Sequence, residues 1–449
     1  MRSELRTSPF GVRSLHAAYR AGALTPHQVV DEVLARTART DDAVWISVFP
    51  AADLHARADE LAACGSDGLP LYGVPFAVKN NIDVAGLPTT AACPAFAYSP
   101  AIDATSVRLL REAGAIVVGT TNLDQFATGL TGSRSPYGAG ESAFGRDLIS
   151  GGSSSGSAVA VASGQVAFAL GTDTAGSGRV PAAMNGIVGL KPTRGLVSTA
   201  GVVPACRSLD CVSVFATSLD DAADVLAVLA VPDPADPWSR PATAQQCSHA
   251  AEHSRVALAG ELDFEDDGTY AAAFARVAAD VRARTGTVDV SIGPLLEAGD
   301  LLYTGPWVAE RLAGLEAFLA SHPDDVLPVT RAVIERGADF SAVDAFRARH
   351  RLQELRAWCD RLWDRADVLL LPTVPTTFTR AQIAEQPVAR NLVLGRYTQF
   401  ANLLDLAAVA VPAGTCADGR PFGVTLLGPA FSEDRLLSAA HQLITREAA

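Results

Sequence analysis

The chain has 449 residues and a formal net charge of −13, so it is long enough for a large buried core and is acidic overall. The charge argues against nucleic acid and anionic membrane surfaces as partners. Since no apolar run reaches about eighteen residues, residues 1–6 lack an apolar signal core, and the cysteines number seven, we expect a cytoplasmic protein.

The N-terminal region, residues 1–65, is predicted to be helical and to pack on the rest of the chain. Thr25-Pro26 opens one of its helices, because threonine is a favoured N-cap and proline fits the first helical turn. Residues 66–449 are assigned to one catalytic domain, since the motifs described below extend over most of this length.

Apolar runs typical of strands continue along the chain, alternating with helical stretches. This alternation predicts an α/β fold with a large mixed, mostly parallel twisted sheet covered by helices on both faces. Pro232–Pro241, rich in proline and aspartate, is the expected surface excursion. The predicted strands are Phe76–Val78, Ala115–Val118, Val166–Leu170, Val368–Leu371, Ala408–Val411 and Val424–Leu427.

Two neighbouring segments, Gly151–Ser157 and Gly171–Arg179, combine serine with glycine. A flexible linker does not fit, because the apolar run Ala158–Ala162 follows at once and predicts a buried helix that begins at the serines. A phosphate-binding loop would need a Lys-Ser or Lys-Thr pair, or an acidic residue at a fixed distance, and neither is present. The pattern favours a loop whose hydroxyls and N–H groups face one bound group, as around a catalytic nucleophile.

Lysine occurs only at Lys79 and Lys191, although the chain has 36 basic residues. A buried amine can lose its proton near neutral pH, whereas a guanidinium stays charged. Lys79 follows a predicted strand, which would place its amine at the strand end; the alternative is a surface lysine in a loop. Lys191 is expected to be structural. None of the eight histidines lies near the serine segments in sequence, which favours a Ser-Lys site without excluding Ser-His-Asp.

Four motifs resemble, in order and spacing, those of the amidase signature family, and the resemblance covers nearly the whole chain. In that family a lysine, a serine in a cis peptide and a nucleophilic serine form the catalytic set, which implies Lys79, Ser153 and Ser177 here. One departure is Asn80, where the family usually has aspartate. The four motifs are Val78–Asp83, Gly151–Ser154, Gly171–Ser177 and Gly189–Thr193.

The chemistry implied by the resemblance is acyl transfer through a serine. The Ser177 hydroxyl becomes nucleophilic when a base removes its proton, and Lys79 can be that base only when neutral. Ser153 would relay the proton from Ser177 to Lys79 and later return it to the departing amine. The backbone N–H groups of four residues are the candidate oxyanion hole: Thr174, Ala175, Gly176 and Ser177.

A second, narrower resemblance concerns the substrate. Leu302–Arg311 is similar to the specificity segment of the allophanate hydrolases, the branch that cleaves the amide of urea-1-carboxylate during urea degradation. The resemblance implies that Arg311 pairs with the substrate carboxylate, that Tyr303 donates to it, and that Gly129 contacts the substrate through its backbone. From spacing alone, Trp307–Leu312 fits equally well an amphipathic helix with a solvated arginine.

Several alternatives remain at this stage. Another small amide, such as malonamate or a carboxybiuret-like molecule, could be the substrate, or the chain could be the A-type component of an amidotransferase. A non-catalytic module that holds an anion in the glycine loop is the alternative outside enzymes. No metal is expected, and Cys206 and Cys211 are predicted to be buried small hydrophobic residues.

The resemblance also implies partners. These are a carboxylate-bearing small amide, a second copy of the chain in a homodimer, and a functional link to a biotin-dependent urea carboxylase. No cofactor is implied. The extra C-terminal domain that allophanate hydrolases often carry is expected to be absent.

Overall fold

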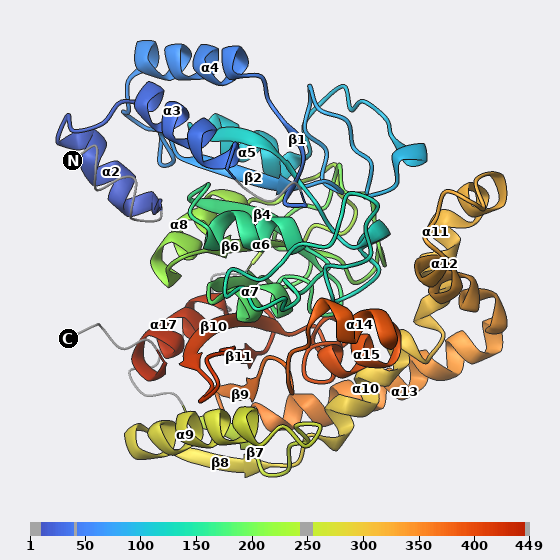
Figure 1. Cartoon of the computed structure of the whole chain (residues 1–449). Helices are drawn as coiled ribbons and strands as arrows, with labels where there is room; N and C mark the ends of the chain where they lie inside the picture. The colour runs from blue at the N-terminus through green and yellow to red at the C-terminus, as the bar shows by residue number, and fades with distance from the viewer. Residues whose placement is uncertain (1–9, 40–42, 243–254, 445–449) are drawn as a thin grey trace.

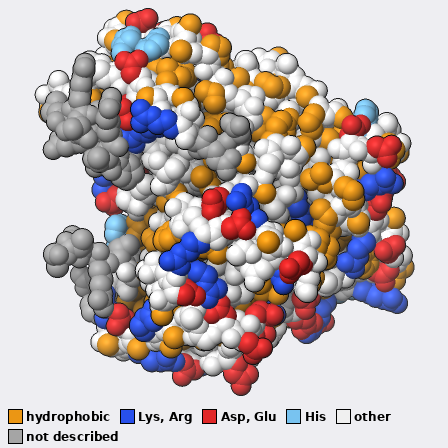
Figure 2. Space-filling model, in the orientation of Figure 1, with side chains coloured by type: hydrophobic (Ala, Val, Ile, Leu, Met, Phe, Trp, Pro, Cys, Tyr) orange, Lys and Arg blue, Asp and Glu red, His pale blue; other side chains and the backbone are white. Residues whose placement is uncertain are grey.

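The computed structural model describes residues 10–39, 43–242 and 255–444. The opening residues 1–6 assessed above lie outside these ranges. No helix within them is long and apolar enough to cross a bilayer. Figure 2 shows acidic and basic side chains interspersed over one face of the molecule.

One sheet of eleven strands forms the centre of the molecule (Figure 1), in the order β1-β3-β2-β4-β6-β5-β10-β11-β9-β7-β8. The strands are β1 (Trp45–Val48), β2 (Pro75–Lys79), β3 (Ile116–Thr121), β4 (Phe168–Asp173), β5 (Val188–Lys191), β6 (Cys211–Ala216), β7 (Val256–Ala259), β8 (Thr287–Val290), β9 (Val368–Pro372), β10 (Ala407–Thr415) and β11 (Pro421–Gly428).

Helices pack against the sheet, and α11 and α12 project from the body at the right of Figure 1. The helices are α2 (Val12–Arg20), α3 (Pro26–Thr37), α4 (Ala51–Cys64), α5 (Thr105–Glu112), α6 (Ser155–Ala162), α7 (Val180–Asn185), α8 (Leu219–Leu229), α9 (Gly268–Arg284), α10 (Gly293–Tyr303), α11 (Trp307–Ser321), α12 (Pro328–Glu335), α13 (Ala342–Leu362), α14 (Arg380–Glu385), α15 (Ala389–Gly395), α16 (Phe400–Leu403) and α17 (Glu433–Leu443).

The strand β9 illustrates how both faces of the sheet are buried. Val368 and Leu370 belong to a cluster with residues of α9 and α17. Leu369 and Leu371 point the other way, into a cluster with residues of α10, α13 and α16. Because successive side chains of a strand face opposite sides, helices cover both faces of the sheet here, and the predicted α/β fold with a mixed sheet is confirmed.

The direction of the strands corrects one detail of the prediction. Among the described residues, four of the ten strand pairings are parallel and six are antiparallel, so parallel pairs are not the majority. One reason is that β10 and β11 are joined by the short turn at residues 416–420, and strands connected this closely must be antiparallel.

Within residues 10–39 and 43–65, the regular elements are the helices α2, α3 and α4 and one strand. The helix α3 begins after Thr25, whose side chain accepts a hydrogen bond from the Gln28 N–H, so this predicted start is confirmed. The strand β1, Trp45–Val48, was not predicted and pairs antiparallel with β3 at the edge of the sheet. Four residues are too few to give a clear periodicity, which explains why the strand was missed.

Candidate active site

Lys79 is the last residue of β2, which lies between β3 and β4, and its side chain is fully buried. Its Nζ donates hydrogen bonds to Ser153 Oγ and to Thr172 Oγ1, both at 2.7 Å. Burial lowers the pKa of Lys79 to about 7, although the Asp124 carboxylate acts in the opposite direction. A substantial fraction of this amine is therefore neutral near pH 7, as a base requires.

Asn80, which differs from the usual aspartate of the family, follows Lys79 and makes four hydrogen bonds. Its amide donates to the Pro88 carbonyl and to Thr120 Oγ1, and its Oδ1 accepts from the N–H and hydroxyl of Thr90. Asn80 therefore shapes the turn after β2, and these four bonds satisfy its amide.

Ser153 lies in the loop that leads into α6, and the Gly152–Ser153 peptide bond is cis, as the resemblance implied. Its backbone carbonyl accepts from the Asp124 N–H at 3.0 Å. A Cβ on Gly152 would lie 2.1 Å from Asp124 Oδ2, so this position has no room for a side chain. Asp124, which sequence reasoning missed, thus fixes the loop that presents Ser153.

Ser177 lies just after β4, in a loop organised by the buried Asp173. The Asp173 carboxylate accepts from the N–H groups of Gly176 and Gly178 and forms a buried ion pair with Arg179. Burial would raise the pKa of Asp173, but the charge and hydrogen bonds of Arg179, together with the charge of Lys191 and the Gly178 N–H, lower it overall. The loop that carries the predicted nucleophile is therefore held by an ionised carboxylate.

The parallel strands β2 and β4 bring the predicted catalytic residues to the same edge of the sheet. Lys79 ends β2, Thr172 lies near the end of β4, and Ser177 follows that strand. The structure thus joins Lys79 to Ser153 directly. No hydrogen bond joins the Ser177 hydroxyl to Ser153 in the described part of the chain, so their relay belongs to the proposal below.

The four candidate oxyanion-hole donors differ in whether they already have an acceptor. The Gly176 N–H donates to Asp173 Oδ1 at 2.9 Å, so this donor is already engaged. The N–H groups of Thr174, Ala175 and Ser177 make no hydrogen bond to the described residues. These three N–H groups are therefore the ones available for an oxyanion.

Arg311 is almost completely buried, with 2 % of its surface exposed, which rules out the alternative of a solvated arginine. Its Nη1 donates to Thr128 Oγ1 at 2.9 Å, whereas Nε and Nη2 are buried without a partner. The guanidinium lies over the Tyr303 ring, 5.4 Å from its centroid. Since unpaired buried N–H groups are costly, this arginine is suited to an anionic ligand.

Gly129 and Arg134 lie close to this arginine. Gly129 directly follows Thr128, and a Cβ there would approach Asp124 Oδ2 to 2.6 Å. Arg134, which sequence reasoning missed, is buried, and burial lowers its pKa, with a further lowering from the charge of Arg311. Its Nε also lacks a partner, which makes this end of the site more cationic than the sequence indicated.

The loop at residues 206–210 connects the helix of Arg311 to the nucleophile loop. On α11, the Glu310 carboxylate accepts from the N–H and the hydroxyl of Ser208, both at 2.7 Å. At the other end, Asp210 accepts from the Thr174 hydroxyl and the Cys206 N–H. This chain of bonds fixes α11 relative to the loop of Ser177.

The two cysteines of this region, Cys206 and Cys211, are buried, as predicted. Cys206 Sγ lies 3.3 Å from a Glu310 carboxylate oxygen, and burial raises its pKa well above the usual value. Among the residues that the structure describes, no cluster of three or more histidine, cysteine, aspartate or glutamate side chains could hold a metal ion.

The amidase family model matches residues 28–437, which is most of the chain. The chain belongs to the amidase family. It is thus an enzyme of a family that acts on amide C–N bonds. Family membership fits the placement of a buried lysine against a serine hydroxyl described above.

Individual members of the amidase family show further similarity. Urea amidolyase of Saccharomyces cerevisiae is 47% identical over 407 residues, which cover 89% of this chain and 22% of that protein. Allophanate hydrolase of Kluyveromyces lactis superposes with a TM-score of 0.92 and 40% identity, over 98% of this chain and 76% of that one.

A glutamyl-tRNA(Gln) amidotransferase component from Natronomonas pharaonis is 36% identical over 411 residues, covering 84% of this chain and 96% of that protein. The chain spans about a fifth of the length of the urea amidolyases that it matches.

Proposed function

We propose that this amidase cleaves the terminal amide of allophanate, releasing ammonia through an acyl-enzyme at Ser177, as a step in urea degradation. The observation that carries the proposal is a buried arginine, Arg311, with two unpaired nitrogens in the same site as a Ser-Lys pair. Its charge is close enough to contribute to the lowered pKa of Lys79. The similarity to allophanate hydrolase of Kluyveromyces lactis supports the same substrate.

The proposed first half-reaction forms a bond from Ser177 Oγ to the amide carbon. Neutral Lys79 accepts a proton through Ser153, so the Ser177 proton leaves as the bond forms. The carbonyl oxygen becomes an oxyanion and accepts from the free N–H groups of the nucleophile loop. The C–N bond then breaks, and Lys79 returns the proton through Ser153 to the nitrogen, which departs as ammonia.

The second half-reaction is hydrolysis of the acyl-enzyme. Water takes the place of ammonia and gives a proton to Lys79 through Ser153 as it attacks the ester carbon. The Ser177–carbon bond breaks, the proton returns to Ser177 Oγ, and the product keeps a carboxylate at both ends. Throughout, Arg311 binds the substrate carboxylate through Nε and Nη2, and the Tyr303 hydroxyl donates to it.

The first test is turnover. Purified protein should release ammonia from allophanate faster than from malonamate, biuret or simple aliphatic amides, and Ser177→Ala should abolish the release while leaving the unfolding temperature unchanged. Retained activity in Ser177→Ala would overturn the assignment of the nucleophile.

The second test separates carboxylate binding from chemistry. In the Ser177→Ala protein, which cannot form the acyl-enzyme, Arg311→Met should weaken allophanate binding about 100-fold by calorimetry, since a charge-assisted bidentate pair is lost. Arg331→Met is the matched control, because Arg331 is a half-exposed arginine on the neighbouring α12, paired with Glu335. Equal affinities in both variants would contradict the role of Arg311.

An amidotransferase component is the second candidate, supported by the similarity to the glutamyl-tRNA(Gln) amidotransferase protein of Natronomonas pharaonis. Such a component would pass ammonia to a partner, so rapid ammonia release by the purified chain alone would count against it.

The remaining proposals concern organisation. We retain the division into an N-terminal segment, residues 1–65, and a catalytic domain, residues 66–449. A functional link to a urea carboxylase is supported by the long relatives named urea amidolyase. The homodimer and the cytoplasmic location stay predictions, which size measurement in solution and cell fractionation would test.

A further inference from the structure

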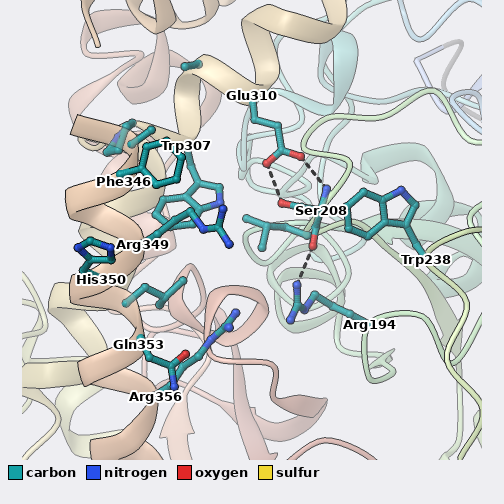
Figure 3. A pocket seen from close by; sticks show the side chains of 15 residues that line it. Arg194, Ser208, Trp238, Trp307, Glu310, Phe346, Arg349, His350, Gln353 and Arg356 are labelled. Atoms are coloured by element: carbon teal, nitrogen blue, oxygen red, sulfur yellow. Dashed lines mark hydrogen bonds between the residues drawn. The ribbon is translucent and has the colours of Figure 1, made fainter. Parts of the chain in front are cut away.

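A cavity of about 810 Å³ lies between α11, α13 and the loops that carry Arg194, Ser208 and Trp238 (Figure 3). Neither Lys79, the two catalytic serines nor Arg311 lines it. The volume is in the range of about 300–1,000 Å³ typical of small-molecule sites. The cavity is therefore a second concave surface, separate from the proposed active site.

The cavity wall carries more positive charge than its own carboxylates balance. Arg194, Arg349 and Arg356 line it, together with one carboxylate, Glu310. That carboxylate already accepts from the N–H and the hydroxyl of Ser208. This excess is local, because the chain as a whole has a net charge of −13.

The three arginines differ in how they are held. Arg356 donates from Nε and Nη2 to the Leu403 carbonyl and forms no ion pair with the described residues. Arg194 donates to the Ser208 carbonyl and shares the Asp405 carboxylate with a further arginine outside the lining. Burial and the neighbouring Arg194 lower the pKa of Arg356, as expected where guanidinium groups gather.

Arg349 is the most available of these cations. It makes no hydrogen bond or ion pair with the described residues, and it lies over the Phe346 ring, 5.9 Å from the centroid. In Figure 3, Arg349 lies on the α13 side of the cavity, opposite Ser208 and Trp238. Its guanidinium is thus free to bind an anion.

Aromatic rings supply the rest of the recognition surface. Trp307 lines the cavity from α11, Phe346 from α13, and Trp238 from the opposite loop. Phe346 and Trp238 are 58% and 43% exposed, which is unusual for large apolar side chains. Flat rings on two sides of a cavity favour a flat ligand, which can stack on them.

We propose that this cavity binds a planar organic anion, with an aromatic or heteroaromatic ring between Trp238, Trp307 and Phe346 and a carboxylate on Arg349 and Arg356. Charge selects the anion, because bidentate arginine pairs favour carboxylates. The three aromatic side chains favour a planar ligand, because a flat ring can stack on them. The proposal does not rest on the assignment of allophanate as the substrate.

The test uses 1-naphthoate as the probe, titrated against the full chain by calorimetry and by quenching of tryptophan fluorescence. One molecule should bind per chain. Two matched compounds separate the two requirements: 1-naphthalenemethanol keeps the ring without the charge, and decahydro-1-naphthoate keeps the charge without the flat ring. Each should bind at least about tenfold more weakly, since each loses one of the two interactions.

Variants locate the site. Phe346 and Arg349 are both exposed, so Phe346→Ala with Arg349→Ala should leave the fold intact and raise the dissociation constant of 1-naphthoate at least about tenfold. Arg347→Ala is the control, because Arg347 lies on the same helix but does not line the cavity. It should leave the affinity unchanged.

Three results would overturn the proposal. They are no binding of 1-naphthoate at millimolar concentration, equal binding of the neutral alcohol, or an affinity that changes in Arg311→Met but not in the α13 double variant. The last result would place the probe in the proposed active site instead.

Discussion

The two lysines of this chain occupy similar positions and have different surroundings. Lys79 ends β2 and Lys191 ends β5, and both side chains are fully buried. Lys79 Nζ donates to two hydroxyl oxygens, those of Ser153 and Thr172. Lys191 Nζ donates instead to the backbone carbonyl of Pro192, with a cysteine sulfur at 3.7 Å.

The difference shows that neither rarity nor burial makes a lysine a base. A base needs a neighbour that can transfer a proton to it, and only Lys79 has serine and threonine hydroxyls within reach. Burial raises the pKa of Asp173, whereas the charge of Arg179 and, to a smaller extent, the charge of Lys191 lower it. The sequence interpretation of Lys191 as structural agrees with these contacts.

The largest expected difference between the lysines is in activity. Lys79→Met should lower kcat by about 10⁴-fold, the upper end of what general acid–base catalysis contributes. Lys191→Met should lower it less than about tenfold, because Asp173 keeps Arg179 as its partner. Ammonia release under saturating substrate measures both, and similar losses in the two variants would remove the distinction.

The next effect is on stability and its dependence on pH. The folded-state pKa of Lys79 is lowered to about 7, so between pH 7 and about 10 the unfolded chain binds a proton that the folded chain does not, and stability rises with pH. Lys79→Met removes this proton uptake. The variant should be more stable than the parent by on the order of 3 kcal/mol near pH 7, with the difference shrinking towards pH 10.

Urea unfolding of the parent and Lys79→Met proteins at several pH values measures this difference. Lys191→Met is again the comparison, and its stability relative to the parent should not follow the same pH course. A constant gap between parent and Lys79→Met from pH 7 to pH 10 would mean that the Lys79 pKa is not lowered.

The smallest of these effects concerns the second hydroxyl on Lys79. Thr172→Val keeps the shape of the side chain but removes the acceptor at 2.7 Å from Nζ, and should lower kcat by about 10- to 100-fold, the worth of one charge-assisted hydrogen bond. Cys211→Ala, beside Lys191, should change kcat less than twofold. If both changes are equally mild, Thr172 does not orient the amine.

The catalytic residues could be predicted because each belongs to a local motif. Lys79 and Ser153 come into contact as expected, and the helix after the serines begins at Ser155. Thr172 and Asp173 lay inside one of the quoted motifs but received no role. The Thr172 hydroxyl contacts Lys79 from another segment, and the Asp173 carboxylate is buried against Arg179. Sequence spacing does not reveal either contact.

Other features depend on contacts between distant segments. Asp124 and Arg134 carry no local pattern, and the burial of Arg311 could not be separated from a solvated helix position by periodicity alone. Five strands were not predicted: β1, β5, β6, β7 and β8. The strand β5, Val188–Lys191, has four residues and contains a glycine, so its strand character comes from pairing with β6 and β10.

The position of β10 has a consequence for how the protein is made. This strand pairs with β5 on one side and β11 on the other, so the edge of β5 stays uncovered on the ribosome until residues 407–415 have emerged. Such open edges invite association with other chains. The nucleophile loop is also incomplete until residues 398–402 have emerged. Thr398 and Asn402 donate hydrogen bonds to the backbone carbonyls of Ala175 and Asp173, respectively. A nascent chain that ends before Thr398 is therefore expected to need a chaperone and to have no activity.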